Sequence, residues 1–290
     1  MLATSPRILA TAEFDSYTGG PRRYSFQPVA AAETSIQPRS ELSGVLLMPD
    51  PTAGLWRLVD TSLADQIVPE LPALRLEQDP IHRHKDVLTH TIAVTAKTEP
   101  ALRLRLAALF HDIGKPATRA YEDGNVTFRN HEAVGAKMTR KRLRALGYDE
   151  DMVRDVTELV RLSGRFKGYA DGWSDSAVRR YARDAGHLLG DLNKLVRSDC
   201  TTRNRAKAER LQEQVDDLER RIVDLAQEDR RRAERPAIDG NRVMELLGLP
   251  AGPLVGEAVR WLLAEKRAGR AADVDAAELA LKDWWSKQQR

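Results

Sequence analysis

The sequence has only one cysteine, Cys200, and no long apolar run. A single cysteine excludes an intramolecular disulfide framework and is typical of proteins in the reducing cytosol. No window approaches the roughly 18 consecutive apolar residues of a membrane span, which predicts a protein without membrane association. Residues 1–14 also lack the apolar stretch of a secretory signal. These absences together predict a cytoplasmic protein.

A strong excess of one charge is also missing. The 290 residues are 42% hydrophobic and 31% charged, with a net charge of only +3, which excludes disorder driven by charge repulsion. The charge is unevenly spread, because residues 1–80 carry six Arg and no Lys against ten acidic residues. The basic surplus therefore lies in the later part of the chain, which favours a polyanionic partner.

The patterns along the chain predict an all-α protein. Residues 1–40 show no sustained period and are expected to form a poorly ordered arm. Apolar residues at alternating spacings of four and three within residues 211–225 predict one long charged helix from Ser198 to Arg235. This stripe is too short for a confident coiled coil, so we interpret it as an internal packing seam. The predicted segments are the arm (1–40), neck helices (41–79), a helical domain (80–200), the long helix (201–236) and a small helical tail domain (237–290).

Two smaller features complete this outline. Asp123-Gly124 predicts a short hairpin between two helices of the helical domain. Asp275 is the predicted cap of the last helix, which reaches Trp284 and Trp285.

Histidines are few and clustered, since four of the six fall within residues 82–111. His111 and Asp112 stand together at the end of a predicted helix, and His90 lies on the helix before it. If these helices pack antiparallel, His90 reaches the same point, and Asp199 from a later helix completes four ligands. Nitrogen and oxygen ligands suit Mn, Co, Ni, Zn or Fe, with Mg as a further option. The sequence thus predicts a divalent metal site at His90, His111, Asp112 and Asp199.

The chemistry expected of this site is phosphoester hydrolysis. A cation held in this way lowers the pKa of bound water and shields the charge of a phosphate. We predict catalytic roles for Asp112, Lys115 and His131, in which Lys115 and His131 orient the phosphate. His131 can alternatively bind a second metal. The plainer alternative is that His111 and Asp112 only cap a helix end.

The other histidines have simpler interpretations. His82 and His84 are expected to make local hydrogen bonds, and His187 is expected to be a surface or capping residue.

The ligand set resembles the HD superfamily of metal-dependent phosphohydrolases. Longer segments resemble bacterial CCA-adding tRNA nucleotidyltransferases of the actinobacterial type, a family that also includes poly(A) polymerases. The resemblance implies an HD-type helical domain followed by the long helix and the small tail domain, and it implies tRNA or another RNA as partner. It covers residues 41–290 and is carried most clearly by residues 50–56, 76–91, 135–146, 197–204 and 247–258.

Two departures from this family stand out. Its members begin with a nucleotidyltransferase head that has a Gly-Ser turn and a paired Asp-x-Asp, and neither motif occurs before residue 41. The chain therefore resembles the neck, body and tail without the head, and a truncated or frame-shifted gene would explain residues 1–40. Relatives also commonly carry histidines where this chain has Ser163 and Lys167. That loss argues against a two-metal site, and it leaves open whether Lys167 supplies a fixed positive charge or the site is inactive.

Basic residues gather on two predicted helices. Residues 137–144 hold five basic residues and no acid, and residues 194–210 are also rich in Arg and Lys. Such faces are often only solvated helix surface, but the resemblance implies contact with an RNA backbone. The predicted RNA-binding residues are Lys137, Arg140, Lys141, Arg144, Arg197, Arg203 and Arg205.

Three hypotheses stay open at this point. The first is a headless relative of the CCA-adding enzymes that binds tRNA and hydrolyses phosphodiesters such as 2′,3′-cyclic nucleotides or RNA 3′ ends. The second is a tRNA-binding module with a vestigial metal site, which would support nucleotidyl transfer only with a separately encoded head. The third is a gene fragment that folds poorly.

Overall fold

The computed structural model describes residues 37–76, 86–122, 125–202 and 204–288. These residues form helices and a single two-stranded hairpin, which confirms the all-α prediction. Most of the predicted arm, together with His82, His84 and Arg203, lies outside the described residues. The first described helix begins at Pro38, inside the segment predicted as an arm. None of the described helices combines the length and the apolar character needed to cross a membrane.

The helices occupy most of the predicted positions, and the hairpin pairs Arg119 with Phe128 at its open end. The elements are α1 (Pro38–Leu46), α2 (Thr52–Asp60), α3 (Leu63–Ile67), η1 (Pro72–Leu74), α4 (Val87–Lys97), α5 (Leu102–Phe110), α6 (Lys115–Thr118), β1 (Arg119–Glu122), β2 (Asn125–Phe128), α7 (His131–Ala145), α8 (Glu150–Leu162), η2 (Ser163–Phe166), η3 (Tyr169–Asp171), α9 (Asp175–Ala185), η4 (Gly186–Leu188), α10 (Leu189–Asp199), α11 (Arg205–Ala233), α12 (Gly240–Leu247), α13 (Pro253–Arg267) and α14 (Val274–Gln288).

Several helices begin at a residue whose side chain accepts a hydrogen bond from a backbone amide of the first turn. Asp86 does so at α4 (2.6 Å to Thr89 N), and Asn204 does so at α11 (3.0 Å to Lys207 N). At α14 this acceptor is Asp273, whose carboxylate lies 2.9 Å from the amide of Ala276. The prediction of Asp275 as the cap is therefore wrong, because Asp275 already lies in the first helical turn.

The long helix predicted from Ser198 to Arg235 starts later than predicted. α10 ends at Asp199 and α11 begins at Arg205. The ammonium group of Lys97 on α4 donates to the carbonyl oxygens of Arg197 (3.0 Å) and Cys200 (2.8 Å). This long-range contact satisfies carbonyls at the end of α10 and holds Asp199 against α4.

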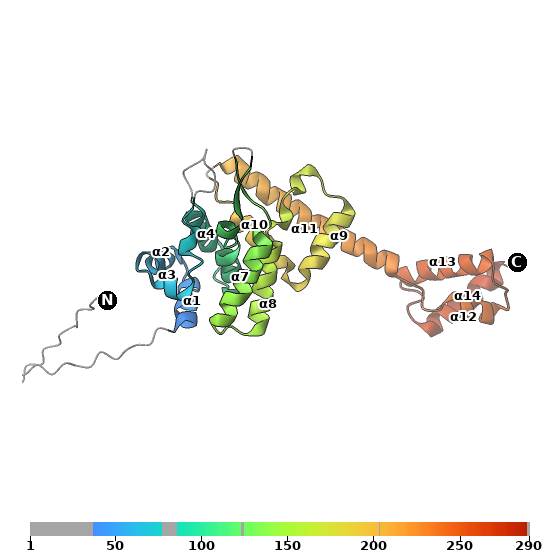
Figure 1. Ribbon diagram of the computed structural model, residues 1–290. Helices are drawn as coiled ribbons and strands as arrows, with labels where there is room; N and C mark the ends of the chain where they lie inside the picture. Colours follow the sequence, from blue (N-terminus) through green and yellow to red (C-terminus); the bar gives the residue numbers. More distant parts are fainter. Residues whose placement is uncertain (1–36, 77–85, 123–124, 203, 289–290) are drawn as a thin grey trace, which may run out of the picture.

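Two separate apolar cores organise the chain, and α11 runs from one to the other (Figure 1). The first core, which we call the body core, is built from α1 to α10 and part of α11. Val215, Leu218 and Leu225 of α11 are buried in it, so the predicted stripe packs within the chain. The second core, the tail core, lies among α12, α13 and α14.

The buried side chain of Arg105 connects the end of α1 and the α1–α2 loop to the rest of the body core. Arg105 of α5 is 1% exposed, and its guanidinium donates to the carbonyls of Leu46 (2.6 Å), Pro49 (3.0 Å) and Thr98 (3.1 Å). It also donates to the carbonyl of Met48. These contacts join the α1–α2 loop to the turn between α4 and α5, which carry the histidines of the site.

Candidate metal centre

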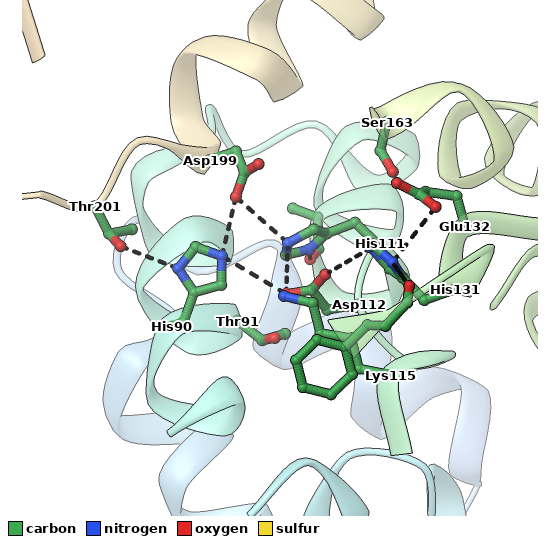
Figure 2. A network of polar contacts seen from close by, with 12 residues as sticks. His90, Thr91, His111, Asp112, Lys115, His131, Glu132, Ser163, Asp199 and Thr201 are labelled. Carbon is green, nitrogen blue, oxygen red and sulfur yellow. Dashed lines mark hydrogen bonds and ion pairs between the residues drawn. The ribbon is translucent and has the colours of Figure 1, made fainter. Parts of the chain in front are cut away.

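Three helices bring the predicted ligands to one point (Figure 2). His90 lies on α4, and Asp199 is the last residue of α10. His111 directly follows α5. The Nε2 atom of His90 is 2.9 Å from Oδ1 of Asp199, and that of His111 is 3.5 Å from the same oxygen. One donor atom from each of these three residues lies within 4.8 Å of the others.

Asp112 completes the predicted set from the same turn as His111. Its Oδ2 atom is 3.2 Å from Nε2 of His111 and 3.7 Å from Nε2 of His90. The turn fits against α7 because Gly114 has no side chain, since a Cβ there would lie only 2.1 Å from the carbonyl oxygen of His131. The structure therefore brings all four predicted ligands together.

The protonation of the histidines leaves a ring nitrogen free for a cation. Nδ1 of His111 lies 2.7 Å from the carbonyl oxygen of Ala108, and a carbonyl can only accept, so Nδ1 carries the proton. Its Nε2 atom is buried and has no hydrogen-bond partner among the described residues. Nδ1 of His90 similarly contacts the hydroxyl of Thr201 at 3.0 Å. A buried nitrogen lone pair facing carboxylates fits a metal ligand, so the residues present suit a divalent cation.

The spacing of the donor atoms supports the same conclusion. A transition metal about 2.1 Å from each ligand holds neighbouring donors about 3.0–3.4 Å apart in octahedral or tetrahedral geometry. The distances between the donor atoms of these side chains run from 2.9 to 3.7 Å. Two imidazoles and two carboxylates favour Mn, Fe, Co, Ni or Zn over a metal that prefers thiolates.

The electrostatics of the site favour a positive charge at this point. Burial opposes charge on His111, but the neighbouring Asp112 and Asp199 carboxylates overcome it and raise the pKa of His111 to about 10. Burial likewise opposes ionisation of Asp112, yet His111, Lys115 and His90 hold the pKa of Asp112 below its usual value. The two histidines also outweigh the cost of desolvation at Asp199 and lower the pKa of this carboxylate. The two carboxylates therefore favour a positive charge beside His111, whether a proton or a bound cation supplies it.

The two residues predicted to orient a phosphate both contact Asp112. The ammonium of Lys115 is buried and lies 2.7 Å from Oδ2 of Asp112. Nε2 of His131 is 3.5 Å from Oδ1 of Asp112, while its Nδ1 donates to the carbonyl of Phe128 at 2.7 Å. Burial lowers the pKa of His131, so this ring favours the neutral form.

Near His131, Ser163 and Lys167 stand where histidines were expected, and both contact other residues of the chain. Lys167 makes an ion pair with Glu132 at 2.9 Å, and Glu132 lies 3.4 Å from Nδ1 of His131. The Ser163 hydroxyl donates to the carbonyl of Val160 at 2.9 Å. Within the described part of the chain, His90, His111 and Asp199 form the single group of side chains spaced to hold a metal ion, and no second group lies at this position.

The site opens towards solvent on one side. The side chain of Asp199 is 47% exposed, whereas that of Asp112 is 3% exposed. Asp199 borders a cleft of about 880 Å³ between the η2–η3 segment and the first turns of α11. A substrate can therefore approach the ligands from the side of Asp199.

The predicted RNA-binding residues fall into two groups. Lys137, Arg140 and Lys141 are exposed on α7. The others that the structure describes are exposed or partly exposed but ion-paired with acids of the same chain: Arg144 with Glu150, Arg197 with Asp216 and Glu219, and Arg205 with Glu209.

Sequence reasoning missed two polar residues of the site. Thr201 supports His90, and Glu132 joins His131 to Lys167. Their only signal in the sequence is that each stands next to, or two residues from, a predicted site residue.

The HD domain family matches residues 87–230 of this chain. The chain is 32% identical over 256 residues to the CC-adding tRNA nucleotidyltransferase of Thermus thermophilus, which covers 85% of this chain and 56% of that protein. It is 32% identical over 254 residues to the A-adding tRNA nucleotidyltransferase of Deinococcus radiodurans, covering 85% and 57%. A shorter match of 30% over 135 residues relates it to the multifunctional CCA protein of Pseudomonas paraeruginosa, covering 45% and 32%.

The chain thus spans somewhat more than half the length of the first two relatives. The match includes the helices that carry His90, His111, Asp112 and Asp199. The chain contains an HD domain and belongs to the family of CCA-adding tRNA nucleotidyltransferases, to whose helical body and tail it corresponds.

Proposed function

We propose that this protein binds tRNA or another RNA and hydrolyses phosphodiesters, such as 2′,3′-cyclic phosphates or RNA 3′ ends, at a divalent metal held by His90, His111, Asp112 and Asp199. The observation that carries the proposal is the buried Nε2 atom of His111, which makes no hydrogen bond with the described residues and lies 3.2 Å from Asp112 Oδ2 and 3.5 Å from Asp199 Oδ1. A bound cation lowers the pKa of a coordinated water and offsets the negative charge of a phosphate.

We assign a separate role in the proposed reaction to each of the other polar residues of the site. Asp112 and Asp199 would hold the cation together with the imidazoles of His90 and His111. Lys115 neutralises Asp112 and would add a fixed positive charge close to the cation. His131 keeps a proton on Nδ1, which leaves Nε2 able to accept a proton beside Asp112.

RNA binding rests on the exposed cations of α7 and on the relatives. Lys137, Arg140 and Lys141 present three exposed positive charges on one helix. The two most extensive relatives are named as tRNA nucleotidyltransferases. A backbone contact of this kind predicts binding that weakens steeply with salt.

Hydrolysis is tested with 2′,3′-cyclic AMP and bis-p-nitrophenyl phosphate in Mn²⁺, Co²⁺, Ni²⁺, Zn²⁺ or Mg²⁺. We expect metal-dependent turnover that falls about 100-fold or more in Asp112→Asn and in Asp199→Asn, because loss of a direct ligand should cost at least as much as loss of its support. Asp151→Asn is the matched control, since that side chain is 82% exposed on α8. Absence of turnover in the folded wild-type protein with every metal would contradict the hydrolase.

The second candidate is an RNA-binding module whose metal site is unused. The contacts of Ser163 and Lys167 favour it, because they supply no ligand for a second metal. It predicts salt-sensitive tRNA binding in gel shifts together with no hydrolysis, and equal tRNA binding by wild type and Asp199→Asn. A separately encoded nucleotidyltransferase head would then be a partner, detectable as CCA addition only when both chains are mixed.

A further inference from the structure

The cleft beside Asp199 has walls of unequal charge. Of the described residues that line it, three are cationic and Asp199 alone is acidic. Lys167 lies on the η2–η3 side, while Lys207 and Arg210 lie on the first turns of α11. Its volume of about 880 Å³ is near the upper end of the roughly 300–1,000 Å³ of ligand sites.

The two cations on α11 are not engaged within the protein. The side chains of Lys207 and Arg210 make no hydrogen bond or ion pair with any residue that the structure describes, and both residues are exposed. By contrast, Arg205, one turn earlier on the same helix, is paired with Glu209. Lys207 and Arg210 are three residues apart and therefore neighbours on the helix surface.

The rest of the cleft suits a nucleotide chain. Phe166, Tyr169 and Leu211 give it apolar walls that can contact a sugar or a base. The N-terminus of α11 also opens on it, since Asn204 and Ala206 line the same space and the helix dipole adds positive potential there. A groove that combines cations with apolar and aromatic walls is typical of sites for single-stranded nucleic acid.

A free mononucleoside cyclic phosphate does not account for these cations. Its single phosphate would lie at the metal ligands, which leaves Lys207 and Arg210 without an anionic partner. A strand supplies further phosphates on the 5′ side of its terminal nucleotide. We propose that Lys207 and Arg210 bind these upstream phosphates, so that the substrate of the site is the 3′ end of a single-stranded RNA. This inference rests on the proposed function for the reacting end, but the binding of the strand is tested separately.

The binding test uses a short fluorescein-labelled RNA with a 2′,3′-cyclic phosphate end and the full chain without added metal. We expect Lys207→Gln/Arg210→Gln to bind about tenfold more weakly than wild type. The slope of log affinity against log salt should become shallower by about 1.4, or about 0.7 for each lost phosphate contact. Arg230→Gln/Arg231→Gln is the matched control, because it removes the same charge from exposed positions about 35 Å further along the same helix.

The kinetic test compares a dinucleotide ending in a 2′,3′-cyclic phosphate with 2′,3′-cyclic AMP in the metal that supports turnover. The Lys207→Gln/Arg210→Gln variant should raise KM for the dinucleotide about tenfold and leave both constants for 2′,3′-cyclic AMP unchanged. Equal binding of the labelled RNA by this variant, the control and wild type would overturn the proposal. Weaker binding by this variant alone, with no hydrolysis by any form, would support the cleft as a strand site and refute the hydrolase instead.

Discussion

The two cores of this protein bury different kinds of side chain. The body core contains buried histidines, carboxylates, a lysine and an arginine, all of them between His90 and Ser198. Among the described residues, the tail core buries apolar side chains and no charged one. Burying a charge costs free energy unless it is paired. Among the described residues, the buried charged side chains are therefore confined to the body core, where the candidate metal ligands lie.

The largest effect on stability is expected from removal of the buried Arg105 in the body core. In Arg105→Met, the carbonyls of Leu46, Pro49 and Thr98 lose their donor inside the protein. We expect the free energy of unfolding of the body to fall by about 3–5 kcal/mol, measured by urea unfolding with circular dichroism. Arg183→Met, at a side chain that is 73% exposed, should change it by less than about 0.5 kcal/mol. An equal change in the free energy of unfolding for the two substitutions would show that the hydrogen bonds of Arg105 do not stabilise the body.

A cavity in the tail core should affect the tail alone. Leu281 is fully buried there, so Leu281→Ala should lower the local stability of the tail by about 2–4 kcal/mol. Hydrogen exchange measured by mass spectrometry should show faster exchange in α12 to α14 and unchanged exchange in α4 and α5. Faster exchange in both regions would mean that the two cores unfold as one unit.

Metal should have the opposite regional effect. At a concentration one hundred times its Kd, a cation that binds only the folded protein adds about 2.7 kcal/mol to stability. Exchange should slow in α4, α5 and α10, which carry the ligands, and stay unchanged in the tail. His111→Gln should abolish the slowing, and a slowing that survives this substitution would place the metal elsewhere.

The smallest effect is expected at the edge of the site. Lys167 pairs with Glu132, but the lysine side chain is 69% exposed. Lys167→Ala should therefore change the free energy of unfolding by about 0.5 kcal/mol or less in thermal or urea unfolding. A loss of several kcal/mol would show that this ion pair supports the body as much as the buried charges do.

The helices and the ligands were predictable for different reasons. Apolar spacing predicts helices over residues 150–162 and 254–266, and the bounds of α8 and α13 lie within one residue of these ranges. The candidate ligands stand out in the sequence because histidines are scarce and because their order resembles a known family. Arg105 left a weak signal, since it falls on the same helix face as Leu102, Leu106 and Leu109, but only the structure shows which carbonyls it meets.

Features that depend on distant contacts were not predictable. The position at which α10 ends involves a contact with Lys97, which lies 100 residues before Arg197 in the sequence. The cleft beside Asp199 likewise requires the η2–η3 segment and α11 to lie side by side. Asp273 and Asp275 are both suitable caps, and the choice depends on where the backbone becomes helical.

The length of α11 has a consequence for any long ligand. Its 29 residues span about 43 Å as a continuous helix from the cleft to the tail core (Figure 1). Because of this length, a short oligonucleotide can contact the cleft or the tail but not both. A folded RNA could contact both ends of α11 only if its own dimensions match this distance. Its shape, as well as its terminal nucleotide, would then determine how it fits the protein.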